Sequence, residues 1–178
     1  MLFKKPAFTL LECLIALSLT MILFMISVMG YRHFITENTL IANVNQMVEA
    51  LRFARMSAIT SHHRVVLLPA SANDWQAGQV ILDQANGNVL RVLPAIVKPY
   101  AFSWKSTLDD SDSLTWRRDG MTFGQQGSFY FCNANSPNHS AEIIILRTGR
   151  LRSIVGNIAG CQKFSANKKF SSLADLER

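Results

Sequence analysis

The residues with the clearest potential for chemistry are basic side chains near the C-terminal end of the chain. Between Ile143 and Phe170 the sequence contains no aspartate or glutamate. The basic residues of this stretch are Arg147, Arg150, Arg152, Lys163, Lys168 and Lys169. Guanidinium groups bind phosphate oxygens through paired hydrogen bonds, and several of them side by side can grip successive phosphates. The segment therefore predicts a surface for an anionic partner, with chance surface positivity as the simpler alternative.

A β-hairpin is expected to position these arginines. Thr148-Gly149-Arg150 lies between two short runs rich in β-branched residues, which predicts a turn in which the glycine supplies positive φ. Side chains alternate along a strand, so Arg150 and Arg152 are expected on one face, with Arg147 across the turn.

The rest of the sequence after Arg64 also predicts antiparallel sheet, because short β-rich runs alternate with turn residues. These runs are Val65–Leu68, Gln79–Leu82, Asn88–Leu93, Phe129–Phe131, Ile143–Leu146 and Leu151–Val155. A further turn is expected at 86–88. Segments 71–78, 105–113 and 133–141 are rich in Ser, Asn, Asp and Pro, which predicts loops.

The N-terminal part predicts a membrane-spanning helix. From Phe8 to Tyr31 the chain has a single charged residue, Glu12, and about 20 apolar residues suffice to cross a bilayer. Lys4 and Lys5 come before this run, so the N-terminus is expected in the cytoplasm and the rest of the chain outside it. A secretory signal fits less well, because the run exceeds the usual apolar core of about 7–15 residues. A carboxylate in lipid is costly, so Glu12 requires a partner or a function.

Beyond the span, apolar residues recur at three- and four-residue spacing, with polar residues between them. The apolar positions are Leu40, Ile41, Val44, Met47, Val48, Leu51, Ala54, Ala58 and Ile59. This pattern predicts that the helix continues as an amphipathic helix, with one apolar face on the sheet. The expected fold class is α+β.

Residues 4–12, Lys-Lys-Pro-Ala-Phe-Thr-Leu-Leu-Glu, closely resemble the type III signal of type IV pilins and type II secretion pseudopilins. The resemblance implies that prepilin peptidase cuts between Ala7 and Phe8 and that Phe8 is then methylated. It also implies that Glu12 pairs with the N-terminal amine of a neighbouring subunit during assembly. The family nearly always has glycine at the position of Ala7, and another small residue is expected to permit cleavage.

The same resemblance implies a pilin fold, in which a long N-terminal helix packs on an antiparallel sheet. The expected organisation is a leader over 1–7, a transmembrane half-helix over 8–31, an amphipathic half-helix over 32–63 and a β-rich globular part over 64–178. The implied location is the inner membrane, with a periplasmic C-terminal part, and then the pilus at the cell surface. The implied partners are the inner membrane and other major and minor pilins.

Later segments resemble one branch, the FimT/FimU minor pilins and the H pseudopilin of type II secretion; they are 51–59, 123–127 and 129–132. The motif Gly149-Arg150-Leu151-Arg152 is similar to the Gly-Arg-x-Arg signature of FimT-like pilins, which bind DNA during natural transformation. This resemblance implies a minor pilin that binds extracellular double-stranded DNA without sequence preference, through the six basic residues named above. The alternative is a structural minor pilin or pseudopilin that primes filament assembly without binding DNA.

Two cysteines fall in the part expected outside the cytoplasm. An oxidising periplasm allows Cys132 and Cys161 to form a disulfide, whereas Cys13 lies in the predicted span. A zinc site is the rival interpretation. It is disfavoured because the sequence has no Cys-x-x-Cys motif and its four histidines lack ligand-like spacing.

The sequence predicts a protein that is not an enzyme and has no cofactor or metal, because no hydrolase, metalloprotease or phosphate-loop motif is present. The composition, 49% hydrophobic with a net charge of +6, excludes a disordered chain and favours an anionic partner.

Overall fold

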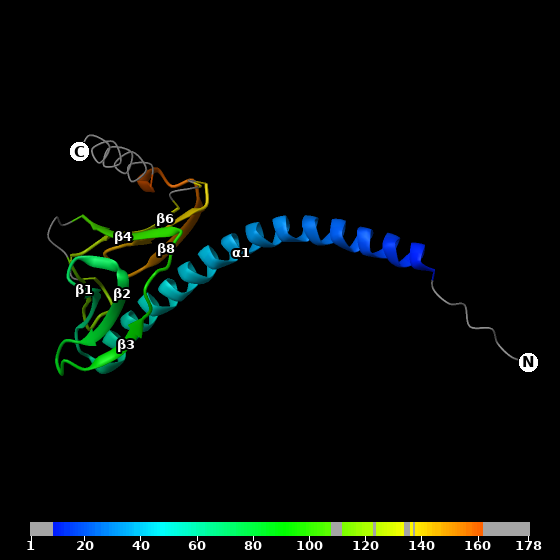
Figure 1. The fold of residues 1–178 in the computed structure, drawn as a ribbon. Coiled ribbons are helices and arrows are strands. Elements are labelled where there is room, and N and C mark those ends of the chain that lie inside the picture. The colour runs from blue at the N-terminus through cyan, green and yellow to red at the C-terminus, as the bar shows by residue number, and fades with distance from the viewer. Residues whose placement is uncertain (1–8, 108–111, 123, 134–135, 137, 162–178) are drawn as a thin grey trace, which may run out of the picture. The chain divides into compact units, whose positions relative to one another are not determined.

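The computed structural model describes residues 9–107, 112–122, 124–133, 136 and 138–161. The helix α1 (Leu10–Ser61) is followed by β1 (Val65–Ser71), β2 (Asp74–Asp83), β3 (Val89–Leu93), β4 (Tyr100–Ser106), β5 (Leu114–Trp116), β6 (Gly127–Asn133), β7 (Ser140–Ile145) and β8 (Leu151–Gly156) (Figure 1). The chain divides into two units, residues 1–39 and 40–178.

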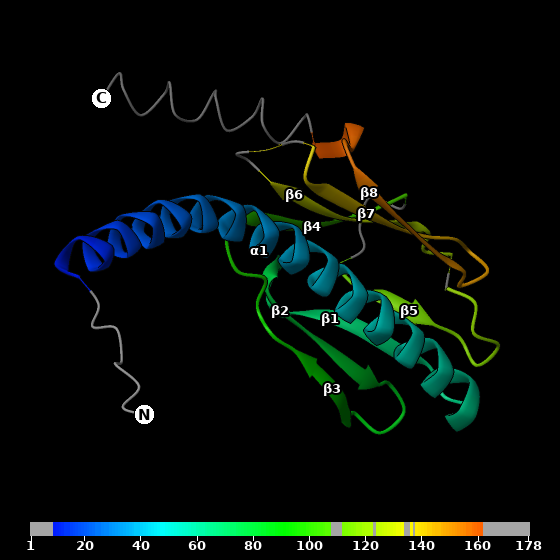
Figure 2. The same cartoon turned by 90° about the vertical axis from the view of Figure 1, so that its right-hand side faces the viewer.

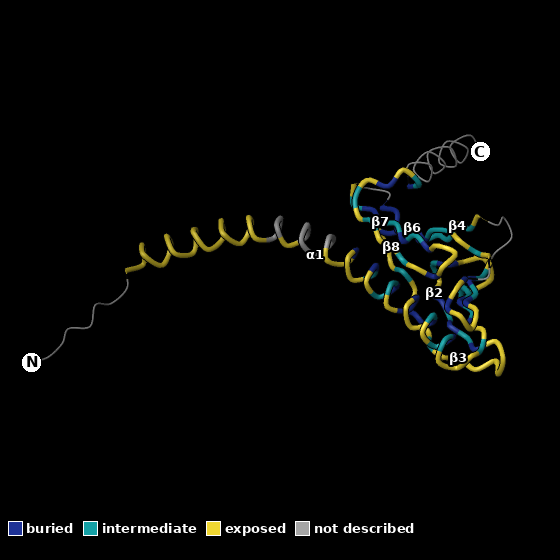
Figure 3. Tube along the Cα trace, turned by 180° about the vertical axis from the view of Figure 1, so that it is seen from behind, coloured by how far each residue is buried: buried dark blue, intermediate teal, exposed yellow. Residues whose placement is uncertain are grey.

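The described part of the first unit is the beginning of α1. The segment Leu10–Ser27 is long and apolar enough to cross a membrane, with a mean hydropathy of 2.3. None of its side chains is buried within the chain (Figure 3). This exposure fits a helix whose surroundings are lipid or other subunits.

Thr9 and Glu12 form a capping box at the start of α1. The Thr9 hydroxyl oxygen accepts the Glu12 backbone N–H at 3.3 Å, and the Glu12 carboxylate accepts the Thr9 backbone N–H at 3.1 Å. Two helix N–H groups are thereby satisfied by side chains.

The second unit contains two antiparallel four-stranded sheets. Their strand orders are β3-β2-β1-β5 and β4-β6-β7-β8. The end of α1 from Leu40 onward lies along both sheets (Figure 2). Its buried positions are Leu40, Val44, Met47, Ala50, Leu51, Ala54 and Ala58. Apart from Ala50 these belong to the predicted apolar pattern, and the α+β fold class is confirmed. Ile41, also expected on the apolar face, is exposed instead.

The three tryptophans help to fill the core. The Trp75 ring lies 5.3 Å from Phe129 and 6.3 Å from Trp104, measured between centroids. Trp116 is completely buried. None of these rings stands exposed as a platform for a ligand.

Strands β4 and β5 were not predicted, and three predicted loops are shorter than expected. Segment 71–78 overlaps β2, segment 105–113 overlaps the end of β4, and segment 133–141 overlaps the ends of β6 and β7. At 71–78, Ser71 pairs with Asp74, after an irregularity in the ladder between Pro69 and Ser71. Pairing with β1 therefore brings the polar start of β2 into the sheet. The composition of this segment could not indicate a strand.

Candidate nucleic-acid interface

The predicted arginine turn lies between β7 and β8. The Leu146 N–H donates to the Arg150 carbonyl at 3.0 Å, and the Gly149 N–H donates to the Leu146 carbonyl at 2.8 Å. Gly149 has φ +74°, the left-handed conformation that closes a three-residue hairpin loop. The turn places Arg147 at its tip, and the predicted positive φ at the glycine is confirmed.

Two other segments hold this turn. The Arg55 side chain, near the end of α1, donates from Nε to the Gly120 carbonyl at 3.0 Å and from Nη2 to the Thr148 carbonyl at 3.3 Å. Thr122 donates its backbone N–H to the Arg147 carbonyl at 3.1 Å and its hydroxyl to the same oxygen at 3.2 Å. The backbone that carries the arginines is thus tied to the helix and to the segment that follows β5.

Arg150 and Arg152 share the face of the second sheet that points away from the core. Leu151, between them, pairs with the buried Ile145, while Arg152 pairs with Ile144. Strand alternation therefore directs Arg150 and Arg152 to the opposite face from Ile145. The side chains of Arg147, Arg150 and Arg152 are all exposed. The structure brings these three predicted residues together at one end of β8.

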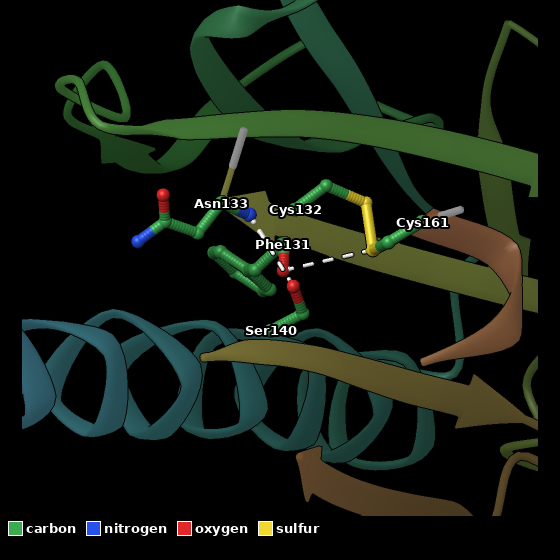
Figure 4. The surroundings of a disulfide bond; sticks show 5 residues. All are labelled: Phe131, Cys132, Asn133, Ser140 and Cys161. Atoms are coloured by element: carbon green, nitrogen blue, oxygen red, sulfur yellow. Dashed lines mark hydrogen bonds between the residues drawn. A yellow bond between two sulfur atoms is a disulfide. The ribbon is translucent and has the colours of Figure 1, made fainter. Parts of the chain in front are cut away.

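The Cys132–Cys161 disulfide lies on this same face. The two cysteines are joined across a sequence separation of 29 residues, as predicted, with their Cα atoms 5.3 Å apart (Figure 4). They pack with Ile158, Tyr130 and Ile154, and Ile154 follows Arg152 by two positions. Cys161 is therefore held on the face that carries Arg150 and Arg152.

The charges on this outer face are not all positive. Glu142 stands on β7 opposite Ile154 and next to Tyr130 on β6. Burial raises the pKa of the Tyr130 hydroxyl above its ordinary value, so this side chain is neutral near pH 7. The positive charge is concentrated toward the turn, and the single described acid of β7 and β8 lies farther along the strands.

Several predicted site residues lie elsewhere. Lys163, Lys168 and Lys169 are outside the described residues, and so are Ala7 and Phe8. Glu12 is described, in the other unit, where it caps α1.

Among the described residues no group of three or more His, Cys, Asp or Glu side chains could hold a metal ion. His62 takes a left-handed conformation, with φ 57°, directly after the end of α1. The neighbouring His63 Nδ1 lies 3.0 Å from an Asp83 carboxylate oxygen.

The residues that the sequence did not indicate are the supports of the turn. Arg55 reaches Gly120 and Thr148 across 65 and 93 residues of sequence, and such contacts leave no periodic signal. Only Gly149 could be recognised in the sequence, as a turn glycine. The structure adds that a side chain at this position would collide with the Gly120 carbonyl.

Residues 43–149 match a family model described as type II transport protein GspH. Two crystal structures of the Pseudomonas aeruginosa (strain PAO1) type IV minor pilin FimU share the fold. The structure in space group P21 is 18% identical, with 68% of this chain and 96% of that chain covered and a TM-score of 0.54. The structure in space group P65 is also 18% identical, with 62% and 88% covered and a TM-score of 0.50.

None of the curated proteins matches the chain. At 18% identity the solved structures establish the pilin fold alone. Pilins and pseudopilins are structural proteins, which agrees with the prediction that the chain is not an enzyme. The family match ends at Gly149, one residue before Arg150. Since the matched region spans more than half of the sequence, the chain belongs to the GspH family of pilin-like transport proteins.

Proposed function

We propose that this pilin-like protein is a minor type IV pilin that binds extracellular double-stranded DNA for uptake in natural transformation. Arg147, Arg150 and Arg152 form the centre of the binding surface, and they contact the phosphate backbone. The observation that carries the proposal is their joint exposure on one hairpin end, whose backbone is fixed by Gly149 and Arg55.

A fixed turn favours phosphate binding for a physical reason. Binding costs conformational entropy, because side chains and backbone become ordered. An arginine on a backbone that is already fixed loses less of this entropy than one on a free backbone. The guanidinium groups then meet phosphates without reading bases, which predicts binding without sequence preference and a strong dependence on salt. Lys163, Lys168 and Lys169 follow Cys161 and extend the proposed basic surface along the chain.

The N-terminal assignments belong to the same proposal. Prepilin peptidase cleaves between Ala7 and Phe8, the new N-terminal Phe8 is methylated, and Glu12 pairs with the amine of a neighbouring pilin. The apolar segment Leu10–Ser27 anchors the protein in the inner membrane before assembly. The mature subunit then joins other pilins in the filament at the cell surface.

The test is a titration of the full chain, in non-ionic detergent, against labelled duplexes of unrelated sequence. With three to six phosphates contacted, the slope of log affinity against log salt is expected to be about −3 to −5. The variant Arg150→Gln plus Arg152→Gln should lower affinity about tenfold or more at low salt and reduce the slope by about 2.

The matched control is Lys98→Gln plus Lys105→Gln, which removes the same charge from exposed positions. Lys105 lies on β4, at the opposite edge of the sheet from β8. This variant should bind nearly as the wild type does. A slope near zero, or equal losses in the two variants, would contradict the proposal.

A second candidate is a structural subunit that primes a pilus or a type II secretion pseudopilus. The family model, described as a type II transport protein, favours it. In that case the basic surface meets acidic sister subunits, and the wild-type chain fails to bind DNA even at low salt.

A further inference from the structure

A second group of arginines lies beside the proposed DNA-binding turn. Arg64, Arg117 and Arg118 line an open cleft of about 360 Å³ together with Asp119. A smaller cleft of about 210 Å³ shares Arg64 and Arg118, so the two are neighbouring parts of one depression. All three arginines are exposed. We propose that this depression, here called the arginine cleft, binds a backbone phosphate of the same DNA duplex, an inference that rests on the proposed function.

The backbone explains why the three arginines converge. Arg64 stands directly before β1, and Arg117 directly follows β5, which pairs with β1 at Val65 and Trp116. After Arg117 the chain turns back: the Gly120 N–H donates to the Arg117 carbonyl at 2.9 Å, and the Arg117 N–H donates to the Met121 carbonyl at 2.8 Å. Adjacent strand ends and a tight turn therefore present the guanidinium groups from two parts of the chain.

Among the described residues that line the two clefts, arginines outnumber acids. Asp119 accepts the Met121 N–H at 3.0 Å and lies 3.8 Å from the Arg117 guanidinium, so it offsets the charge of Arg117. His63 lines the smaller cleft and faces Asp83, and the Asp83 carboxylate also accepts the Ala85 N–H. The arginine cleft thus keeps an excess of guanidinium groups, the groups that bind phosphate oxygens in pairs.

The cleft adjoins the β7–β8 turn through direct backbone contacts. Thr122, at the end of the turn that begins at Arg117, donates its N–H to the Arg147 carbonyl, and Gly120 packs against Gly149. In Figure 2 the segment after β5 and the β7–β8 turn lie on the same side of the molecule's second unit. A duplex presents phosphates at regular short intervals, so one duplex lying on the turn reaches the cleft as well. This adjacency favours DNA over an isolated acidic side chain of another pilin.

The test uses the full chain in non-ionic detergent and the same labelled duplexes. Arg117→Gln plus Arg118→Gln should lower affinity about fivefold to tenfold at low salt and reduce the salt slope by about 1, because one phosphate contact is lost. Combined with Arg150→Gln and Arg152→Gln, it should reduce the slope further, because different phosphates are lost. Asp119→Asn keeps a carbonyl oxygen for Met121 and removes the opposing charge, so it should raise affinity about twofold to threefold.

Wild-type-like tryptophan fluorescence and thermal unfolding establish that each variant is folded, and the opposite sign expected for Asp119→Asn cannot result from misfolding. If the Arg117 and Arg118 variant binds like the Lys98 and Lys105 control while the Arg150 and Arg152 variant loses binding, the inference is wrong and the proposed function stands. If the wild type does not bind DNA at all, the proposed function and this inference are both wrong. An acidic protein would then be the partner that fits the cleft.

Discussion

Gly149 is the residue at which the arginine turn depends most on the absence of a side chain. Its φ is +74°, and a Cβ there would collide with the Gly120 carbonyl and lie 3.0 Å from the Arg55 Nε. Gly149→Ala should therefore destabilise the second unit by about 2–3 kcal/mol, the left-handed conformation contributing about 1–2 of this. DNA affinity should fall several-fold, because the arginines lose their fixed backbone.

The chain offers a matched control in Gly87, which has φ +69° and nothing within 4 Å of an added Cβ. Gly87→Ala tests only the cost of holding an alanine in the left-handed conformation. It should destabilise the second unit by about 1 kcal/mol and leave DNA binding unchanged. Unfolding can be followed by tryptophan fluorescence, since Trp75, Trp104 and Trp116 all lie in the second unit. Equal destabilisation by the two substitutions would show that space at Gly149 does not matter.

At the scale of elements, the end of α1 is joined to the end of β2 by a titratable contact. His63 donates from Nδ1 to the Asp83 carboxylate at 3.0 Å, and Ala85 donates its N–H to the same carboxylate at 2.9 Å. These two hydrogen bonds hold the pKa of Asp83 below its ordinary value of 3.8, and the bond from His63 has the larger effect. A carboxyl group whose pKa is lowered by folding stabilises the folded protein at pH values above the pKa that it has in the unfolded chain. This stabilisation is lost as the pH falls through the lower pKa of the folded state.

Asp83→Asn should accordingly lower the unfolding temperature at pH 6, and the difference from wild type should shrink below about pH 4. The measurement is a series of thermal unfolding curves between these values. In a His63→Gln background the pH-dependent part of the difference should become smaller, because the largest cause of the shift is gone. A difference that stays constant with pH would rule out this linkage.

The elements that the sequence predicted well are those whose residues carry their own signal. The spacing of Leu40, Val44 and Met47 predicted the buried helix face, and the β-branched run at 143–146 predicted the second half of β7. Strand β5 has three residues, Leu114–Trp116, and exists because it pairs with β1. No local pattern distinguishes so short a strand from a loop.

The same contrast applies to the candidate site. Arg150 and Arg152 were predictable from strand alternation and from the turn glycine. The arginine cleft was not, because Arg64 lies more than 50 residues before Arg117 in the sequence and their meeting depends on the β1–β5 pairing. At the start of α1 the Thr9-x-x-Glu12 spacing was readable as a capping box, and it gives Glu12 a local role alongside the assembly role proposed for it.

At the scale of the whole molecule, the basic surface is assembled from parts that are distant in sequence. Helix α1 supplies Arg55, the start of β1 supplies Arg64, and the β7–β8 turn supplies the predicted arginines. The disulfide joins Cys161, the last described residue, to Cys132 on β6. The end of the described chain is thereby fixed to the same sheet. The disulfide therefore fixes the point from which the chain continues to the proposed binding residues Lys163, Lys168 and Lys169.

The last prediction concerns this closure. In the variant Cys132→Ser plus Cys161→Ser, the unfolded second unit regains the freedom of a loop with a 29-residue separation, which corresponds to about 3–4 kcal/mol of lost stability. DNA affinity at a temperature where the variant is folded should fall, because the chain after Cys161, which carries the three lysines, is no longer tied to β6. The salt slope should decrease by about 1–3, one for each lysine contact that is lost.

The control for that measurement is Cys13→Ser, which changes the one free cysteine of the described chain and leaves the second unit intact. If the double variant loses stability but binds DNA with an unchanged slope, the lysines after Cys161 contribute nothing to binding. The arginines of the turn and of the cleft would then account for the whole of the DNA-binding surface.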